Sequence, residues 1–128
     1  MIQTLNHILM VEDELDIQTV ARLSLESVGG FKVDICSSGQ EALDNVLQIN
    51  PDLILLDVMM PGMDGPTTLQ ELKKIPELSD TPVIFMTAKV QPQEVQQYKE
   101  LGAIDVIPKP FDPMTLSDHV RTIWENNQ

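Results

Sequence analysis

Disulfides and a basic surface are both missing from this sequence of 128 residues. Its one cysteine, Cys36, excludes a disulfide framework and favours a reducing compartment, where a small thiol usually acts as a structural core residue. Eight basic residues stand against twenty acidic ones, and the resulting net charge of −12 would repel phosphate backbones and anionic lipid. We therefore expect no direct binding to nucleic acid.

Long hydrophobic runs are also absent. Residues 1–11 have no basic n-region, and their apolar run covers only Ile8 to Val11. No stretch approaches the roughly 20 apolar residues that a bilayer span needs, so we expect a cytoplasmic protein without a membrane partner. The length suits a single domain, 1–128, which can bury about two-thirds of the surface of its unfolded chain.

Short apolar runs alternate along the chain with longer amphipathic segments, which is the pattern of an α/β fold. The apolar runs predict strands at about 7–11, 31–36, 53–57, 83–87 and 105–108. Residues 53–57 show no polar alternation, which indicates a strand covered on both faces, as in a parallel sheet. The last run contains Pro108 and is expected at an edge of the sheet.

The amphipathic segments predict five helices, at about 14–28, 39–49, 66–75, 92–101 and 113–124. Ser38 and Glu41 form a capping box for the second helix, and Asp112 is expected to cap the last. Strict alternation of strands and helices predicts a doubly wound parallel sheet with right-handed crossovers. Spacing places six residues on the core stripe of the first helix: Ile17, Val20, Ala21, Ser24, Leu25 and Val28.

Polar side chains lie at the ends of four predicted strands. Asp13 follows the first strand, Asp57 ends the third, Thr87 ends the fourth and Lys109 follows the fifth. In a parallel sheet these ends meet at one edge, where open α/β sheets bind their ligands. Taken singly, the acids could be first-turn helix residues, Thr87 a cap and Lys109 a surface charge. Their joint position indicates one site instead.

This set of residues resembles the receiver domain of two-component response regulators, over nearly the whole chain. The family's acidic pair matches Glu12-Asp13, its phosphoacceptor matches Asp57, its hydroxyl position matches Thr87 and its lysine matches Lys109. The resemblance implies a flavodoxin-like fold with strand order 2-1-3-4-5. It also implies a receiver that is activated by phosphorylation of Asp57.

The chemistry of the matched acids points to Mg²⁺. Glu12, Asp13 and Asp57 would repel one another in a partly buried pocket, and a divalent cation relieves this repulsion. Because Mg²⁺ takes few protein oxygens and keeps several waters, we expect ligation by Asp13, Asp57 and the Met59 carbonyl, with Glu12 acting through water. Asp57 would then attack a phosphoryl group and form an aspartyl phosphate.

Two further residues of the family pattern bear on the switch. Lys109 would pair with one phosphoryl oxygen, and Thr87 would hydrogen-bond another and pull its loop inward. The resemblance also implies a cis peptide between Lys109 and Pro110. Three residues before the lysine, where the family often has an aromatic ring, this chain has Val106, which has little rotamer freedom. We therefore expect output through the loop after residue 87 and the helix at 92–101.

The resemblance also implies partners. A histidine kinase or histidine phosphotransfer protein would donate the phosphoryl group and dock beside the first helix, where Leu15 and Leu23 are candidate contacts. No DNA-binding helix pair follows the last helix, so a downstream effector protein is expected to read the signal. A naturally single-domain protein and a receiver excised from a longer chain both fit, and a phosphorylation-dependent dimer is compatible with either. The chain would not be an enzyme beyond catalysing its own phosphorylation and slow dephosphorylation.

Three other functions compete with this interpretation. A phosphatase that forms an aspartyl phosphate would need a second acid two residues after its nucleophile, where this chain has Met59. A flavin-binding module would need a phosphate loop rich in Ser, Thr and Gly after the first strand, where the sequence is acidic. A receiver fold kept only as a phosphorylation-independent docking scaffold is the remaining alternative. Met59 and Lys89, which are poor at orienting water, predict slow hydrolysis of the aspartyl phosphate.

Overall fold

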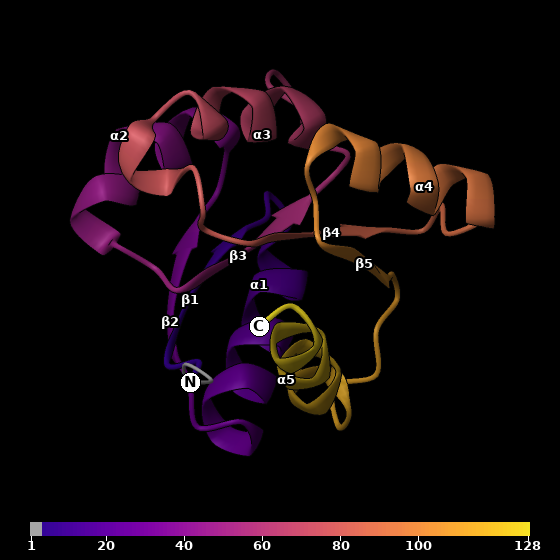
Figure 1. The fold of residues 1–128 in the computed structure, drawn as a ribbon. Coiled ribbons are helices and arrows are strands. Elements are labelled where there is room, and N and C mark those ends of the chain that lie inside the picture. The colour runs from indigo at the N-terminus through magenta and orange to yellow at the C-terminus, as the bar shows by residue number, and fades with distance from the viewer. Residues whose placement is uncertain (1–3) are drawn as a thin grey trace.

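A computed structural model describes residues 4–128 of the chain. Five parallel strands form one sheet in the order β2-β1-β3-β4-β5, which confirms the doubly wound fold and places β5 at an edge (Figure 1). Each strand lies within one residue of its predicted bounds. They are β1 (His7–Val11), β2 (Lys32–Cys36), β3 (Leu53–Asp57), β4 (Val83–Thr87) and β5 (Asp105–Pro108).

Helices cover both faces of the sheet. In Figure 1, α1 and α5 lie on one side, and α2, α3 and α4 lie on the other. The helical segments are α1 (Leu15–Leu23), a π-helical turn (Ser24–Val28), α2 (Gly39–Ile49), α3 (Gly65–Lys73), a 3₁₀ turn (Pro76–Leu78), α4 (Pro92–Leu101) and α5 (Leu116–Asn126). Within residues 4–128, no helix is both long and apolar enough to cross a bilayer.

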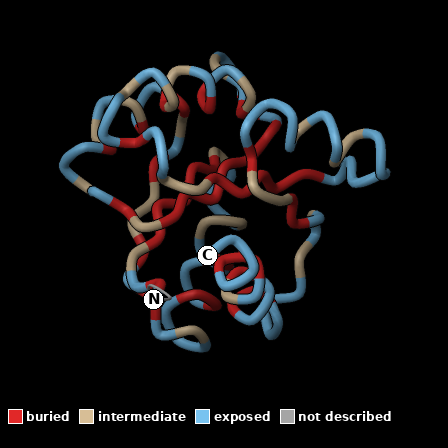
Figure 2. Tube along the Cα trace, viewed as in Figure 1, coloured by how far each residue is buried: buried red, intermediate tan, exposed pale blue. Residues whose placement is uncertain are grey.

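The two faces of the sheet bury separate hydrophobic cores, and β3 contributes to both. Leu53 and Leu55 pack against α1 and α5, whereas Ile54 and Leu56 pack against α2 and α3. All five residues of β3 are buried, and Figure 2 shows the buried trace running through the centre of the sheet. This confirms the interpretation of the apolar run and places Asp57 at the end of the best-covered strand.

The prediction for the first helix is partly wrong. Its last turn is π-helical, and the amide of Gly29 bonds the carbonyl of Ser24, five residues back, at 3.2 Å. This wider turn shifts the side chains around the axis, so Val28 is exposed although regular spacing places it on the core stripe. Val20 is also exposed, because it lines a groove with Phe111 beside the β5–α5 loop instead of packing on the sheet.

The last helix begins later than predicted. The Oδ1 atom of Asp112 accepts from the amide of Met114 at 2.8 Å, and the Asp112 carbonyl accepts from the amides of Thr115 and Leu116. Asp112 therefore opens a turn that leads into α5 and does not cap the helix itself, which starts at Leu116. Trp124 is buried near the end of α5 and packs in the core between this helix and the sheet.

Candidate functional site

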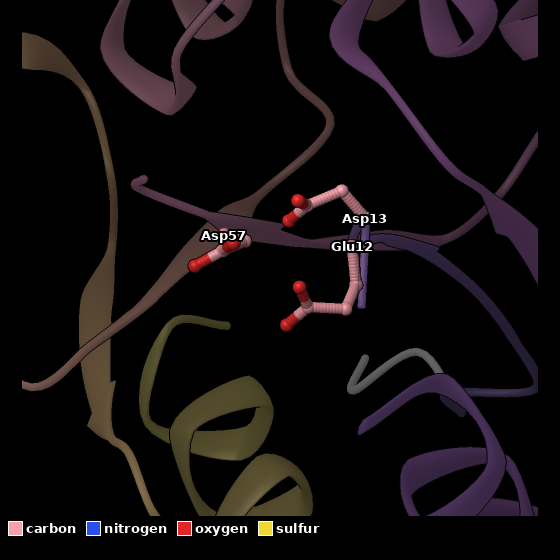
Figure 3. A group of neighbouring side chains, drawn as sticks. All are labelled: Glu12, Asp13 and Asp57. Atoms are coloured by element: carbon pink, nitrogen blue, oxygen red, sulfur yellow. The ribbon is translucent and has the colours of Figure 1, made fainter. Parts of the chain in front are cut away.

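Two adjacent strands bring the three acids together. Val11, the last residue of β1, pairs with Leu56 of β3, so the residues that follow Val11 lie next to Asp57. Glu12, Asp13 and Asp57 can each offer one oxygen so that all three oxygens lie within 4.8 Å of one another. Figure 3 shows the three carboxylates converging at this end of the sheet. The predicted acidic cluster is therefore present in the structure.

The acids are largely shielded from solvent. Glu12 is fully buried and Asp57 is 4% exposed, while Asp13 is half-buried. The backbone around Glu12 is fixed, since its amide donates to the Cys36 carbonyl of β2 at 3.0 Å. One Glu12 oxygen, Oε2, accepts from the amide of Glu14 at 3.2 Å. These bonds leave the other oxygen, Oε1, facing the site.

Lys109 supplies the one ammonium group that contacts these acids in the described chain. Its Nζ atom lies 2.8 Å from Glu12 Oε1 and 3.2 Å from Asp57 Oδ1, and its side chain is 16% exposed. The amide of Lys109 donates to the Thr87 carbonyl at 2.9 Å, which ties the β5 end to the β4 end. The peptide between Lys109 and Pro110 is cis, as expected.

Burial and charge shift the ionisation of this pair. Burial, together with the nearby Asp57 charge, raises the pKa of Glu12 to about 7, although bonds from Lys109 and the Glu14 amide oppose the shift. Burial alone would lower the pKa of Lys109, but its bonds and charge attraction to Glu12 and Asp57 outweigh this effect and raise it. Lys109 is therefore held as a cation against two carboxylates.

The cluster has the donors that a hard cation needs. Three carboxylates face one ammonium group, so an uncompensated negative charge remains in a shielded pocket. Oδ1 of Asp13 is buried and bonds no group of the described residues, so this oxygen could ligate a metal ion. All the donors are carboxylate oxygens, the ligands that Mg²⁺ prefers. The residues present therefore fit a divalent cation.

Thr87 lies at the same edge of the sheet, at the end of β4. It is 4% exposed, and its Oγ1 atom accepts from the amide of Lys89 at 3.1 Å. This bond explains the local turn after β4. Because the hydroxyl acts as the acceptor in it, its own proton is still available for donation to another group.

The sequence patterns did not identify two residues that support the site. The side chain of Gln18 donates to the Glu12 carbonyl at 2.6 Å and to Ser37 Oγ at 3.1 Å, so it braces the β1–α1 turn. A Cβ atom at Gly65 would lie 2.5 Å from the Asp57 carbonyl oxygen, so α3 can start this close to β3 only with glycine. The glycine in Met63-Asp64-Gly65 was the available signal, whereas nothing in the sequence singles out Gln18.

Met59 and Lys89, each two residues beyond a site residue, line one open groove of about 470 Å³ with Tyr98 of α4. The Met59 side chain is 70% exposed. Val106 is buried on β5, where its neighbour in register is Phe85 of β4. The ring of Phe85 also contacts the ring of Tyr98 on α4, edge to face with 5.2 Å between their centroids.

A doubly wound sheet with converging acids, a hydroxyl and a lysine at its carboxyl edge is the arrangement that the resemblance to receiver domains predicts. The family profile described as the response regulator receiver domain matches residues 8–121. The chain therefore belongs to the response regulator receiver domain family, as the sequence motifs suggested.

Individual relatives agree with this assignment. The chain is 39% identical to the transcriptional regulatory protein CpxR of Escherichia coli (strain K12), over 97% of this chain and 53% of CpxR. It is 37% identical to the probable transcriptional regulator ycf27 of Guillardia theta, over 95% of this chain and 46% of that protein. The chain thus spans about half the length of these curated relatives.

A solved structure shows the same fold over its full length. The chemotaxis response regulator CheY4 of Vibrio cholerae superposes with a TM-score of 0.86 at 28% sequence identity. The match covers 94% of this chain and 99% of that chain. The fold is therefore that of CheY-like receiver domains.

Proposed function

We propose that this receiver domain accepts a phosphoryl group on Asp57, in a Mg²⁺-dependent reaction, from a histidine kinase or a histidine phosphotransfer protein. The observation that carries the proposal is the placement of Asp57, a nearly buried carboxylate at the end of a fully buried strand, 3.2 Å from the Lys109 ammonium and beside two further acids. Such a carboxylate is fixed in position and has little freedom to turn away from a bound phosphoryl group.

The transfer step involves few groups. One oxygen of Asp57 forms a bond to phosphorus while the bond from phosphorus to the donor nitrogen breaks, and the electron pair of that bond leaves with the imidazole. Lys109 is already beside Asp57 Oδ1 and would follow the charge onto a phosphoryl oxygen. Its fixed amide, bonded to the Thr87 carbonyl, keeps the side chain directed at the site.

Asp13, Asp57 and the Met59 carbonyl would hold Mg²⁺, with Glu12 acting through water. The unpartnered Oδ1 atom of Asp13 supports this assignment. When bound, Mg²⁺ supplies positive charge that offsets the negative charge of the phosphoryl oxygens. Apart from the transfer to Asp57 and a slow loss from it, we propose no enzymatic activity for the chain.

The output would come from Thr87 and the segment after it. Donation of the Thr87 proton to a phosphoryl oxygen would draw this residue toward Asp57 and shift the Lys89 amide bonded to it. The neighbouring α4 has no fully buried residue, so it can move with little loss of packing. The changed surface would bind a downstream effector, or a second copy in a phosphorylation-dependent dimer. If a phosphoryl analogue moves only Val106, this route is wrong.

Intact-mass measurement tests the proposed function. The protein is incubated with Mg²⁺ and acetyl phosphate, as wild type, as Asp57→Asn and as Asp80→Asn, the last being an exposed acid far from the site. We expect one added phosphoryl group on the wild type and on Asp80→Asn, none on Asp57→Asn, and none on any of them in EDTA. Equal labelling of Asp57→Asn would overturn the assignment. Absence of labelling under conditions that label another receiver would leave a docking scaffold as the function.

A further inference from the structure

The methionines of this chain differ sharply in their access to solvent. Met10, Met60 and Met86 are buried in the described structure, whereas Met59 and Met114 are 70% and 69% exposed. Both exposed thioethers can therefore meet a small oxidant. They differ in position, since Met59 lies two residues after Asp57 and Met114 lies in the turn before α5.

The backbone on both sides of Met59 is fixed. The amide of Val58 donates to the Met86 carbonyl at 3.1 Å, and the Val58 carbonyl accepts from the Gly65 amide at 2.9 Å. Met60, on the other side, is 7% exposed and packs in the core under α3. The backbone of Met59 is thus fixed beside the groove of about 470 Å³ that this residue lines with Lys89 and Tyr98.

Lys89 lines the same groove and places a cation beside any oxygen that is added to the Met59 sulfur. Its amide is bonded to Thr87 Oγ1, so its backbone is fixed beside the site. Its exposed ammonium group belongs to none of the ion pairs within residues 4–128. The thioether of Met59 offers it only a weak acceptor.

We propose that Met59 is an oxidative modification site whose sulfoxide shortens the lifetime of the phosphoryl group on Asp57. The sulfur lone pair of Met59 attacks the terminal oxygen of a hydroperoxide, the O–O bond breaks and an S–O bond forms, and the proton on that oxygen passes to the departing hydroxide or alkoxide. Sulfur is oxidised by two electrons, and the peroxide is reduced to water or an alcohol. The effect on lifetime rests on the proposed function, whereas the modification itself does not.

Two consequences of the sulfoxide act in the same direction. Its oxygen is a strong acceptor and can orient a water molecule for attack on phosphorus, which the thioether cannot do. It also attracts the Lys89 ammonium and so removes a cation that would otherwise shield the phosphoryl group. We expect loss of phosphate to become faster by about threefold or more, the change that one added hydrogen bond to the reacting water would give.

Peptide mapping after treatment with hydrogen peroxide tests the modification. We expect sulfoxide at Met59 and Met114, and almost none at the buried Met10, Met60 and Met86. Protection of Met59 in the folded protein at a level equal to that of Met10 would overturn the proposal, whatever the phosphorylation assays show.

The lifetime is measured in Met114→Leu and in Met59→Leu, each compared with its own unoxidised sample. Oxidation should speed the loss of phosphate in Met114→Leu, and methionine sulfoxide reductases should reverse the change, while Met59→Leu should not respond. Met59→Gln, which places a carbonyl oxygen at the same depth, should lose phosphate faster without oxidant. An equal response of both leucine variants would overturn the proposal. If unoxidised wild type accepts no phosphoryl group, the proposed function fails, and the mapping still decides the modification site.

Discussion

Replacing Lys109 by methionine should destabilise the protein in a manner that depends on pH. The change keeps the length of the side chain and removes the ammonium that lies 2.8 Å from Glu12 and 3.2 Å from Asp57. Glu12 is fully buried, and its carboxylate would lose its only cationic contact in the described structure. Removing one partner of a buried ion pair usually costs about 3–5 kcal/mol.

The size of the loss follows from the ionisation of Glu12. The folded pKa of about 7 lies above the ordinary value of 4.5, so the charged form already costs the wild type roughly 3 kcal/mol at pH 8. This cost disappears as the pH falls toward 4.5, because the folded state then holds the proton. Lys109 lowers the pKa of Glu12, so its removal raises that pKa further. At pH 8 this adds at most about 1.4 kcal/mol, because Glu12 then takes up a proton instead of staying charged.

Urea unfolding in EDTA measures this difference. We expect Lys109→Met to be less stable than wild type at both pH values, and by about 1 kcal/mol more at pH 8 than at pH 5, where Glu12 is protonated in both proteins. The double variant with Glu12→Gln should show the same difference from Glu12→Gln alone at both pH values. A Lys109→Met loss that is equal at pH 5 and pH 8 would refute the reasoning.

Three further predictions test the site and the core beside it. Gly65→Ala should lower the free energy of unfolding by about 2 kcal/mol or more in urea titrations, because the new Cβ meets the backbone of Asp57. Burial and the nearby acids Glu41 and Asp34 raise the pKa of Cys36 to about 11. At pH 8 this thiol should therefore react with iodoacetamide about 100-fold more slowly than in the unfolded chain, as measured by peptide mass. The double variant Met59→Asn/Lys89→Glu should lose its phosphoryl group faster than wild type in a timed intact-mass assay; an equal rate would show that these side chains do not set the lifetime.

The core of the site could be predicted because it depends on the backbone topology alone. Once residues 53–57 and 83–87 are parallel strands, Asp57 and Thr87 must lie at one edge, and the residues after β1 must join them. The same argument predicts the neighbourhood of Lys109, but it cannot predict that Lys109 bonds Glu12 at a shorter distance than Asp57. Such distances depend on side-chain packing, which has no signature in the spacing of residues.

The errors arose where local geometry departs from regular periodicity. Val28 is exposed because a π-helical turn breaks the 3.6-residue repeat on which the prediction relied. The side chain of His7 is 15% exposed, and its Nε2 atom lies 2.6 Å from Asp34 on β2. That contact joins two strands 27 residues apart in the sequence, so no local pattern could reveal it.

The buried state of Cys36 makes this protein well suited to site-specific labelling. It is the only cysteine in the sequence, it is 2% exposed, and its thiol stays protonated at neutral pH. A cysteine introduced at an exposed position such as Ser79 or Asp80, in the α3–β4 connection at the opposite end of the sheet from Asp57, would be the one thiol that a maleimide probe reaches quickly. A fluorophore placed there would report on partner binding by the native chain without the removal of any natural residue from its core.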